Sequence, residues 1–321
     1  MRKATKFWLI TATVLFLVGT MIFGGVMMAV GWNFKNLSTV KYETNSHTVS
    51  EPFHGISVET DTANVTFLPS EDGTCRVVCY EEEKIKHVVE VENGTLKIHA
   101  ENKKGWYEYI GINFDSSKVT VYLPQDSDAW LEVKTSTGKV EIPAGFKLQS
   151  VDISVSTGHV TVGASTLGVT KIKATTGDVK VENTSVGELD LKTSTGKINV
   201  TDVTCEGNLT TKVSTGKTTL TGVICEDLTS HGSTGSITLT DVIASGRISI
   251  ERSTGNVIFD RTDAAELVVD TDTGDVKGSL LTDKIFFAKS ETGRVIVPES
   301  MVGGRCEIES DTGDIKITVG E

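Results

Sequence analysis

The sequence predicts an all-β fold, a single-stranded parallel β-helix or solenoid with coils of 19–20 residues, preceded by one transmembrane helix. Three observations predict it: a Thr-Gly dipeptide at near-constant spacing, alternating apolar and polar residues between the dipeptides, and one uncharged apolar stretch near the N-terminus. The composition agrees, because only 6% of the 321 residues are aromatic while β-branched residues, which pack well on pleated strands, are plentiful.

The repeat is a Ser, Thr, Asp or Glu followed by Thr-Gly, and its ten glycines are 19 or 20 residues apart. Such a period is typical of solenoids, in which each coil buries its apolar face on its neighbours. We expect the glycines to form corners where the backbone turns with positive φ. They are Gly138, Gly158, Gly177, Gly196, Gly216, Gly235, Gly255, Gly274, Gly293 and Gly313.

Between the glycines, apolar residues and Thr alternate with polar residues, as expected for half-buried strands. The alternation changes phase at each glycine and again near Asp202, Gly222 and Asp241. This pattern predicts about three short strands per coil, stacked in parallel, and by the same parity it places the Thr before each Gly inside. Cys205 and Cys225 fall at the same coil position, so we expect stacked buried thiols, with a disulfide between them as the alternative.

Residues 1–6 are basic, and residues 7–31 form a stretch of 25 residues without a charge, long enough to cross a bilayer as a helix. Positive charge before the span predicts a single-pass anchor in the cell membrane, with the N-terminus cytoplasmic and the C-terminal domain extracytoplasmic. The alternative is a cleaved signal peptide ending near residues 29–31.

The rest of the chain divides by its regularity. Residues 32–49 are polar and unpatterned and suggest a stalk, residues 50–130 suggest irregular N-terminal coils, and residues 131–321 form the regular solenoid. Residues 62–65 (Thr-Ala-Asn-Val) look like a degenerate copy of the turn, with Ala in place of Gly. We therefore expect the irregular coils to cap the inner end of the rod.

The segment KVTVYLPQDSDAWLEVKTSTGKVEIP (residues 118–143), followed by repeated Ser-Thr-Gly turns, resembles the bacterial putative adhesin domain of unknown function. The resemblance covers about residues 50–319. It implies a β-solenoid, often on a single membrane anchor, in proteins linked to cell-envelope stress and surface adhesion. It brings no catalytic residues to this chain, which departs from the family by more acidic corners in its last coils.

The outward position four residues before each glycine is basic in the early coils and mostly acidic later. Its lysines form a candidate ligand face for an anionic cell-wall polymer or an envelope protein: Lys134, Lys173, Lys192 and Lys212. The alternative is that these charges only keep the strand edges soluble. A net charge of -12 argues against a nucleic-acid partner.

Two further clusters are candidate sites. The acidic corners of the last coils, Asp272, Asp275, Glu291, Asp311 and Asp314, could supply oxygens to Ca²⁺. In sequence order the two Asp-Thr-Gly-Asp turns are two coils apart, too wide for one ion without the glutamate. The aromatic cluster Trp106, Tyr107 and Tyr109 predicts either a loop that folds its rings over the open coil end or a platform for a sugar or a protein.

No acid–base pair stands out, and the six histidines are not at zinc-ligand spacing. We therefore predict a protein that is not an enzyme and needs no cofactor. The sequence favours a membrane-anchored extracytoplasmic binding protein, an adhesin or a surface protein related to cell-envelope stress. The alternatives are a structural element that assembles through its solenoid ends and a polysaccharide-active enzyme.

Overall fold

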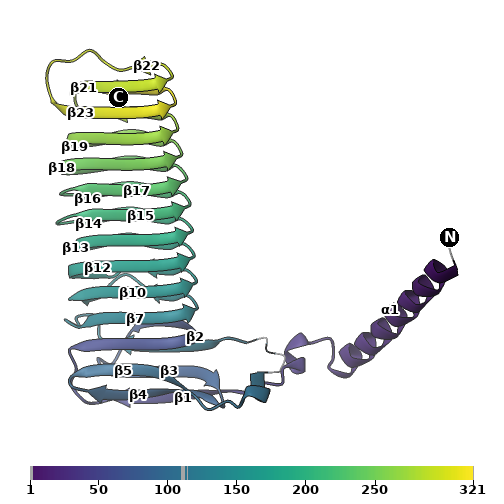
Figure 1. The fold of residues 1–321 in the computed structure, drawn as a ribbon. Helices are drawn as coiled ribbons and strands as arrows, with labels where there is room; N and C mark the ends of the chain where they lie inside the picture. The colour runs from purple at the N-terminus through teal and green to yellow at the C-terminus, as the bar shows by residue number, and fades with distance from the viewer. Residues whose placement is uncertain (1–2, 110–112, 114, 321) are drawn as a thin grey trace.

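The computed structural model describes residues 3–109, 113 and 115–320. The chain forms a rod of stacked strands, and a single long helix lies apart from it (Figure 1). Helix α1 (Lys3–Ala29) contains an apolar stretch from Ala4 to Ala29, and an 18-residue window within it has a mean hydropathy of 2.2 and no buried residue. The predicted N-terminal apolar helix is therefore confirmed, with the properties of a membrane anchor or a signal sequence.

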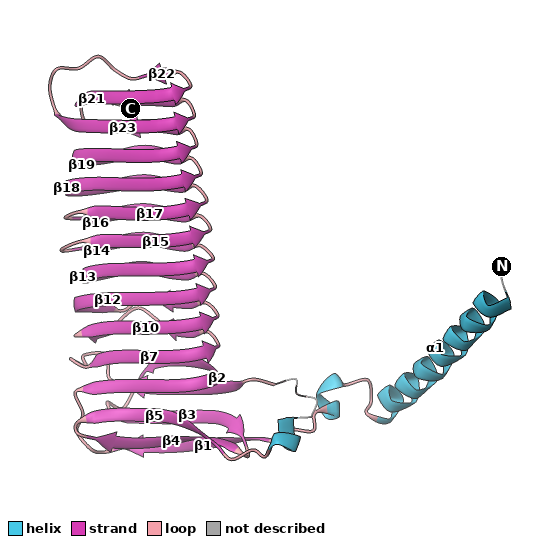
Figure 2. Cartoon of the chain, in the orientation of Figure 1, coloured by secondary structure: helices cyan, strands magenta, loops and turns pink. Residues whose placement is uncertain are grey.

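The parallel β-solenoid predicted from the repeat is also confirmed, and Figure 2 shows that strands make up almost all of the rod. Equivalent strands of successive coils pair in parallel; β10, for example, pairs with β7 and with β12. The regular coils comprise β7 (Trp130–Thr137), β8 (Val140–Ile142), β9 (Lys147–Leu148), β10 (Ser150–Thr157), β11 (Val160–Val162), β12 (Ser165–Thr176), β13 (Val179–Thr195), β14 (Ile198–Cys205), β15 (Leu209–Thr215), β16 (Thr218–Cys225), β17 (Leu228–Thr234), β18 (Ile237–Thr254), β19 (Val257–Thr273) and β20 (Val276–Leu280).

The Thr-Gly corners stack in one column, and nine of the ten predicted glycines have positive φ. Gly293, in the coil at the end of the rod, does not. A Cβ built on Gly216 would lie 1.7 Å from the carbonyl oxygen of Gly196, and Gly216 has a φ of 148°. Glycine is therefore required at this position for two reasons: the positive φ and the close approach of the neighbouring coil. The second corner also has positive φ, between 51° and 62° at Asn183, Asp202 and Gly222, so the predicted phase change at that position is confirmed.

The prediction that the Thr before each Gly faces inward is wrong. In β15, Thr211 and Val213 are buried, but Ser214 and Thr215 are both exposed. The pleat is interrupted just before the corner, so two consecutive side chains face solvent. The register shows the same interruption, since Val213 and Thr215 have partners in β17 while Ser214 has none.

The inner end of the rod is closed by antiparallel strands rather than by the expected irregular coils. Strand β2 pairs in parallel with β7 on one side and with β5 and β6 on the other. Beyond this layer the direction reverses: β4 pairs antiparallel with β5, and β3 with β6 and β1. These elements are η1 (Phe34–Leu37), β1 (Tyr42–Val49), β2 (Gly55–Pro69), β3 (Cys75–Glu82), β4 (Ile85–Glu92), β5 (Thr95–Asn102), η2 (Trp106–Tyr109) and β6 (Ser117–Leu123).

Two segments of this cap are the turn at residues 62–65 and strand β1. Gly138 stacks on Ala63, whose carbonyl oxygen would lie 2.0 Å from an added Cβ, so the degenerate turn at residues 62–65 occupies a corner of the column. Strand β1 lies in the range expected to be a stalk. It was missed because the less exposed face of this strand carries the polar residues Glu43, Asn45 and His47, which hide the apolar alternation.

The last two coils do not stack in sequence order. The final coil, β23 (Gly304–Thr312) and β24 (Ile315–Val319), lies between the β19–β20 coil and the coil of β21 (Lys284–Thr292) and β22 (Val295–Ile296). Figure 1 shows β21 and β22 at the far end of the rod, with the connecting loop arching beyond them.

The burial of the two coils reflects this order. Cys306, Ile308 and Ile315 are fully buried, whereas Phe286 and Ala288 are only partly buried. The coil with neighbours on both sides is thus covered, and the end coil leaves part of its apolar surface exposed. The outermost coil is consequently not the one that ends the chain.

The interior is a continuous apolar core along the rod. All five cysteines are buried free thiols. Thr204 pairs in register with Ile224, so Cys205 and Cys225 share a coil position as predicted. Both are free thiols in this structure and not a disulfide. Burial raises the pKa of Cys225 to about 12, so this side chain is a neutral thiol at physiological pH.

Candidate ligand-binding face

The predicted lysines stand in one column on the outer surface of the rod. In register the column reads Lys134, Ser154, Lys173, Lys192 and Lys212 along five neighbouring coils. The column forms because each residue lies four positions before its corner glycine, on the outward side of the strand. Neighbouring strands are about 4.8 Å apart, so Lys134 and Lys212 are separated by about 19 Å of rod.

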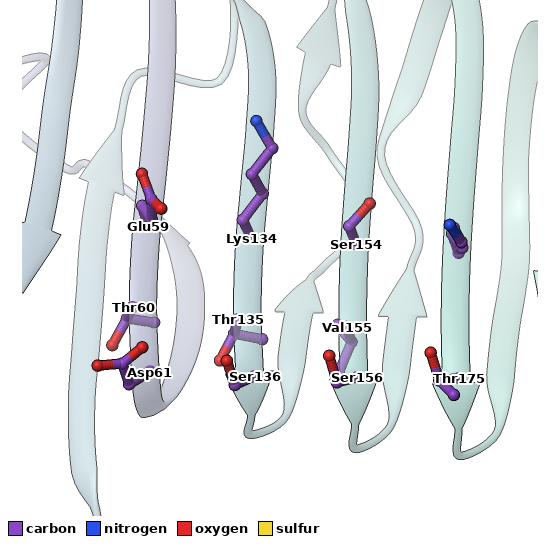
Figure 3. A pocket seen from close by; sticks show the side chains of 11 residues that line it. Glu59, Thr60, Asp61, Lys134, Thr135, Ser136, Ser154, Val155, Ser156 and Thr175 are labelled. Atoms are coloured by element: carbon purple, nitrogen blue, oxygen red, sulfur yellow. The ribbon is translucent and has the colours of Figure 1, made fainter.

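A second column of hydroxyl groups runs beside the lysines, two residues before each glycine. Figure 3 shows its beginning, with Ser136, Ser156 and Thr175 in line below Lys134 and Ser154. The column continues through Ser194, Ser214 and Ser233. Two shallow grooves lie between the columns, of about 270 Å³ near Lys134 and Lys173 and about 240 Å³ near Lys192 and Lys212. The face therefore combines cationic heads with hydrogen-bonding hydroxyls.

The lysines differ in their neighbours. Lys134 lies 2.5 Å from Glu132, and this hydrogen bond raises the pKa of the lysine. Within the part of the chain that the structure describes, no ion pair is recorded for Lys173, Lys192 or Lys212, and all three are exposed. Three consecutive cations are thus available to a ligand.

Acidic residues bound this basic stretch at both ends. Glu59 precedes Lys134 in the column, and beyond Lys212 stand His231 and Glu251, 2.8 Å apart. The reordered last coils place Asp270 directly beside Glu309. Burial raises the pKa of Asp270, and the surrounding carboxylates add to the effect. The rod is therefore basic along its middle coils and acidic toward its far end.

The expectation for the calcium candidates changes with the coil order. Asp272 and Asp311 lie in neighbouring coils, not two coils apart, because Thr271 pairs with Ser310. Asp275 and Asp314 have a structural role: each accepts a hydrogen bond from a backbone N–H of the next coil, at 3.0 and 2.9 Å.

Among the described residues, the only three Cys, His or acidic side chains that bring ligand atoms within 4.8 Å of one another are elsewhere: Cys79, Glu81 and His87. In the described part of the chain, no three of the candidate acids, Glu291 included, bring their carboxylate oxygens within this distance.

The aromatic cluster does not fold over a coil end. Trp106, Tyr107 and Tyr109 in η2 are 80%, 62% and 60% exposed. The ring of Trp106 contacts that of Tyr107 edge-on, with centroids 6.2 Å apart, and Lys104 lies over Tyr109. The interpretation as a cap is wrong, whereas the interpretation as a platform stays a prediction.

The buried cluster of Cys79, Glu81 and His87 was missed in the sequence. The spacing of histidines alone gave no signal, because the other two ligands are a cysteine and a carboxylate. The alternation Cys79-x-Glu81, followed after a short turn by His87, was the available sign, since alternate residues of a strand point the same way.

The fold and its outer face define a class of protein: a parallel β-solenoid with a repetitive polar surface, preceded in the chain by an N-terminal apolar helix. Within that class the chain belongs to the Toastrack DUF4097 family, whose model matches residues 53–216.

The chain is also similar to a putative adhesin from Parabacteroides merdae, with 14% identity, a TM-score of 0.46, and coverage of 87% of this chain and 96% of that one. A putative adhesin from Bacteroides fragilis has 15% identity, a TM-score of 0.40, and coverage of 87% and 97%. No curated protein matches the chain.

Proposed function

We propose that this protein is a membrane-anchored surface protein that binds an extended anionic polymer along the lysine column. The observation that carries the proposal is the run of Lys173, Lys192 and Lys212, three exposed neighbours without recorded ion pairs, beside a column of hydroxyl groups. A regular ladder of like cations suits a ligand that repeats its charge, such as a phosphate-bearing or carboxylate-bearing cell-wall polymer.

The face is suited to binding rather than to chemistry. The lysines are exposed and the grooves are shallow, so water is not excluded as it is from an active site. The hydroxyls can hydrogen-bond a sugar or phosphate, and the cations can move on flexible stems to match the polymer. Acidic residues at both ends of the column confine the ligand to the middle coils.

The test is a binding titration of the full-length protein in detergent with purified teichoic acid, and with a neutral glucan as a control polymer. We expect binding of the anionic polymer that weakens as salt rises, because exposed charges are screened. Changing Lys173, Lys192 and Lys212 together to Ser should lower the affinity at least tenfold. A matched triple change of Lys180, Lys217 and Lys277, exposed lysines outside the column, should have little effect.

Equal losses in both triple variants would show that net charge, and not the column, governs binding. If teichoic acid did not bind the wild-type protein even at low salt, the proposal would be wrong.

We further propose that α1 remains as an anchor, with the rod on the extracytoplasmic side. The support is the basic N-terminal segment before the apolar helix. Protease added to spheroplasts carrying an N-terminal tag should remove the rod and spare the tag. Protection of the rod would contradict this orientation, and loss of the tag from the membrane fraction would indicate a cleaved signal sequence.

Assembly through the solenoid ends stays a second candidate. The feature that favours it is the outermost coil, where Phe287, Ile296 and Met301 are 55%, 53% and 94% exposed beside an unpaired strand edge. Light scattering of the full-length protein in detergent tests it: a dimer that the change Phe287→Ser converts to a monomer would support assembly by this end. A monomer at all concentrations would exclude it.

A further inference from the structure

The cap at the inner end of the rod contains a compact group of three side chains that can each ligate a metal. They are Cys79 and Glu81 from β3 and His87 from β4, and their ligand atoms all lie within 4.8 Å of one another. The residues are 0%, 1% and 4% exposed. The group lies in the cap, apart from the lysine column.

The local fold explains how the three meet. Cys79 and Glu81 alternate on β3 and point to the same side. The chain reverses after Glu82, which pairs with Ile85 as the one paired position between β3 and β4. Beyond this position β3 pairs with β6 and β4 pairs with β5. Strands β3 and β4 therefore diverge, and an interior corner lies between them. His87 enters that corner from the opposite strand.

The polar contacts in this corner already orient the ligands. Glu81 Oε2 accepts hydrogen bonds from the backbone N–H of His87 at 2.6 Å and from its Nδ1 at 2.7 Å. Glu81 Oε1 accepts one from the side-chain amide of Asn45 at 2.8 Å, and His87 Nε2 lies 3.3 Å from Thr60 Oγ1. Such outer partners fix ring orientation and carboxylate position at protein metal sites.

We propose that Cys79, Glu81 and His87 bind a Zn²⁺ ion. A thiolate, an imidazole nitrogen and a carboxylate oxygen together form a donor set that suits zinc, whereas Ca²⁺ and Mg²⁺ prefer oxygen alone. Zinc bonds of about 2.0–2.3 Å in a tetrahedron place the ligand atoms roughly 3.3–3.8 Å apart. The Glu81–His87 contact would have to open by less than about 1 Å, and the fourth position is left for water.

Zinc binding releases protons from the ligands. The Cys79 thiol loses its proton to solvent as the sulfur–zinc bond forms. His87 must offer a lone pair at Nδ1, so a proton held there either leaves or moves to Nε2, where Thr60 Oγ1 can accept a hydrogen bond from it. Zinc affinity should therefore rise with pH.

The surface between β1 and β4 is hollowed. A groove of about 290 Å³ is lined there by His47, Val49, Val89 and Val91. His47 is the next residue after Asn45 on the same face of β1, and Asn45 contacts Glu81. The Nε2 atom of His47 is buried without a hydrogen-bond partner among the described residues.

The experiment uses full-length protein in detergent, stripped with a chelator and titrated calorimetrically with ZnCl₂. We expect one zinc ion per chain, and Co²⁺ in its place should show thiolate-to-metal charge-transfer absorption. Cys79→Ser and His87→Gln should each weaken zinc binding at least tenfold. The matched control is Cys75→Ser, since Cys75 lies four residues away on the same strand, is also buried, and is not in the group.

Two results would overturn the proposal: stripped wild-type protein that takes up no zinc, or zinc binding that is unchanged in both ligand variants. In either case the cluster would only be a buried hydrogen-bonded pair that stabilises the cap. If Cys79→Ser fails to fold by circular dichroism, the Co²⁺ absorption of the wild type against Cys75→Ser decides whether Cys79 is a ligand. The measurement is independent of polymer binding by the lysine column.

Discussion

Inside the rod, Gly232 leaves room for the buried side chain of Arg252 in the neighbouring coil. A double-mutant cycle at these two positions tests whether this contact between stacked coils determines stability. Arg252 is 2% exposed and pairs in register with Gly232 one coil away. A Cβ on Gly232 would lie 2.5 Å from the Arg252 guanidinium. The guanidinium donates hydrogen bonds to Ser230 Oγ at 2.7 Å and to the Glu251 carbonyl oxygen at 3.0 Å. Burial lowers the pKa of Arg252 to about 10, so it is charged at neutral pH.

The two single changes should differ strongly. Gly232→Val inserts a side chain into the space of the guanidinium; overpacking costs about 1–3 kcal/mol, and loss of a hydrogen bond to a charged group costs roughly 1.5–3 kcal/mol. We expect a total of about 3–5 kcal/mol. Arg252→Val leaves a cavity on the order of 50 Å³, which costs about 1 kcal/mol. It also removes a buried charge that has no carboxylate partner among its recorded hydrogen bonds, which offsets that cost.

The double variant Gly232→Val with Arg252→Val should restore an apolar column, because Val213 occupies the equivalent position in the preceding coil. Its stability should be near that of the wild type, and the coupling energy should be about 3 kcal/mol, at the upper end for residues in contact. The assay is thermal denaturation of the full-length protein in detergent, followed by circular dichroism.

For a domain of this size 1 kcal/mol shifts Tm by about 2–4 °C, so Gly232→Val should lower Tm by roughly 6–20 °C. The reasoning would be refuted if the double variant melted as low as Gly232→Val alone, because the loss would then come from the glycine backbone and not from the arginine.

Three further predictions concern the corners, the coil order and the acidic end. Gly216→Ala places a Cβ 1.7 Å from a backbone carbonyl and should cost about 2–5 kcal/mol in a thermal melt, from strain and overpacking; an unchanged melt would contradict the corner column. Val268 and Glu307 pair in register, so the double variant Val268→Cys with Glu307→Cys should form a disulfide under oxidation. Val268→Cys with Phe287→Cys should not. The reverse result would show that the coils stack in sequence order. The pKa of Asp270 is raised, so this carboxyl binds a proton more readily in the folded protein than in the unfolded chain. Asp270 therefore destabilises the rod as pH rises through that pKa. Asp270→Asn should raise Tm at neutral pH and low salt, the gain in Tm should disappear in acid, and a gain that does not depend on pH would exclude this explanation.

The sequence predicted the solenoid, the corner glycines and the lysine column, because all three depend on the period of the repeat. A residue four places before the glycine stands in the same column whichever coils are neighbours. For the same reason the sequence could not reveal that Ile308 lies next to Val269: every coil carries the same phase, so the pattern permits any order.

The cap escaped prediction for a different reason. Its strands carry polar residues on their inner faces, such as Asn45, Glu81 and His87, which satisfy one another by hydrogen bonds. A search for apolar alternation therefore finds a stalk where β1 lies. The outward Thr before each glycine was also mispredicted, because parity assumes an uninterrupted pleat, and the pleat breaks before the corner.

These features give the rod two ends of different character. In a solenoid each coil is stabilised mainly by its neighbours, so an end coil without a partner is the least stable unit. The inner end avoids this weakness, since antiparallel strands cover its last parallel layer and a buried polar cluster joins β3 to β4. The outer end has only the β21–β22 coil, with Phe286 and Ala288 half-buried. Fraying should therefore begin far from α1, while the lysine column and the cap stay within the stable part of the rod.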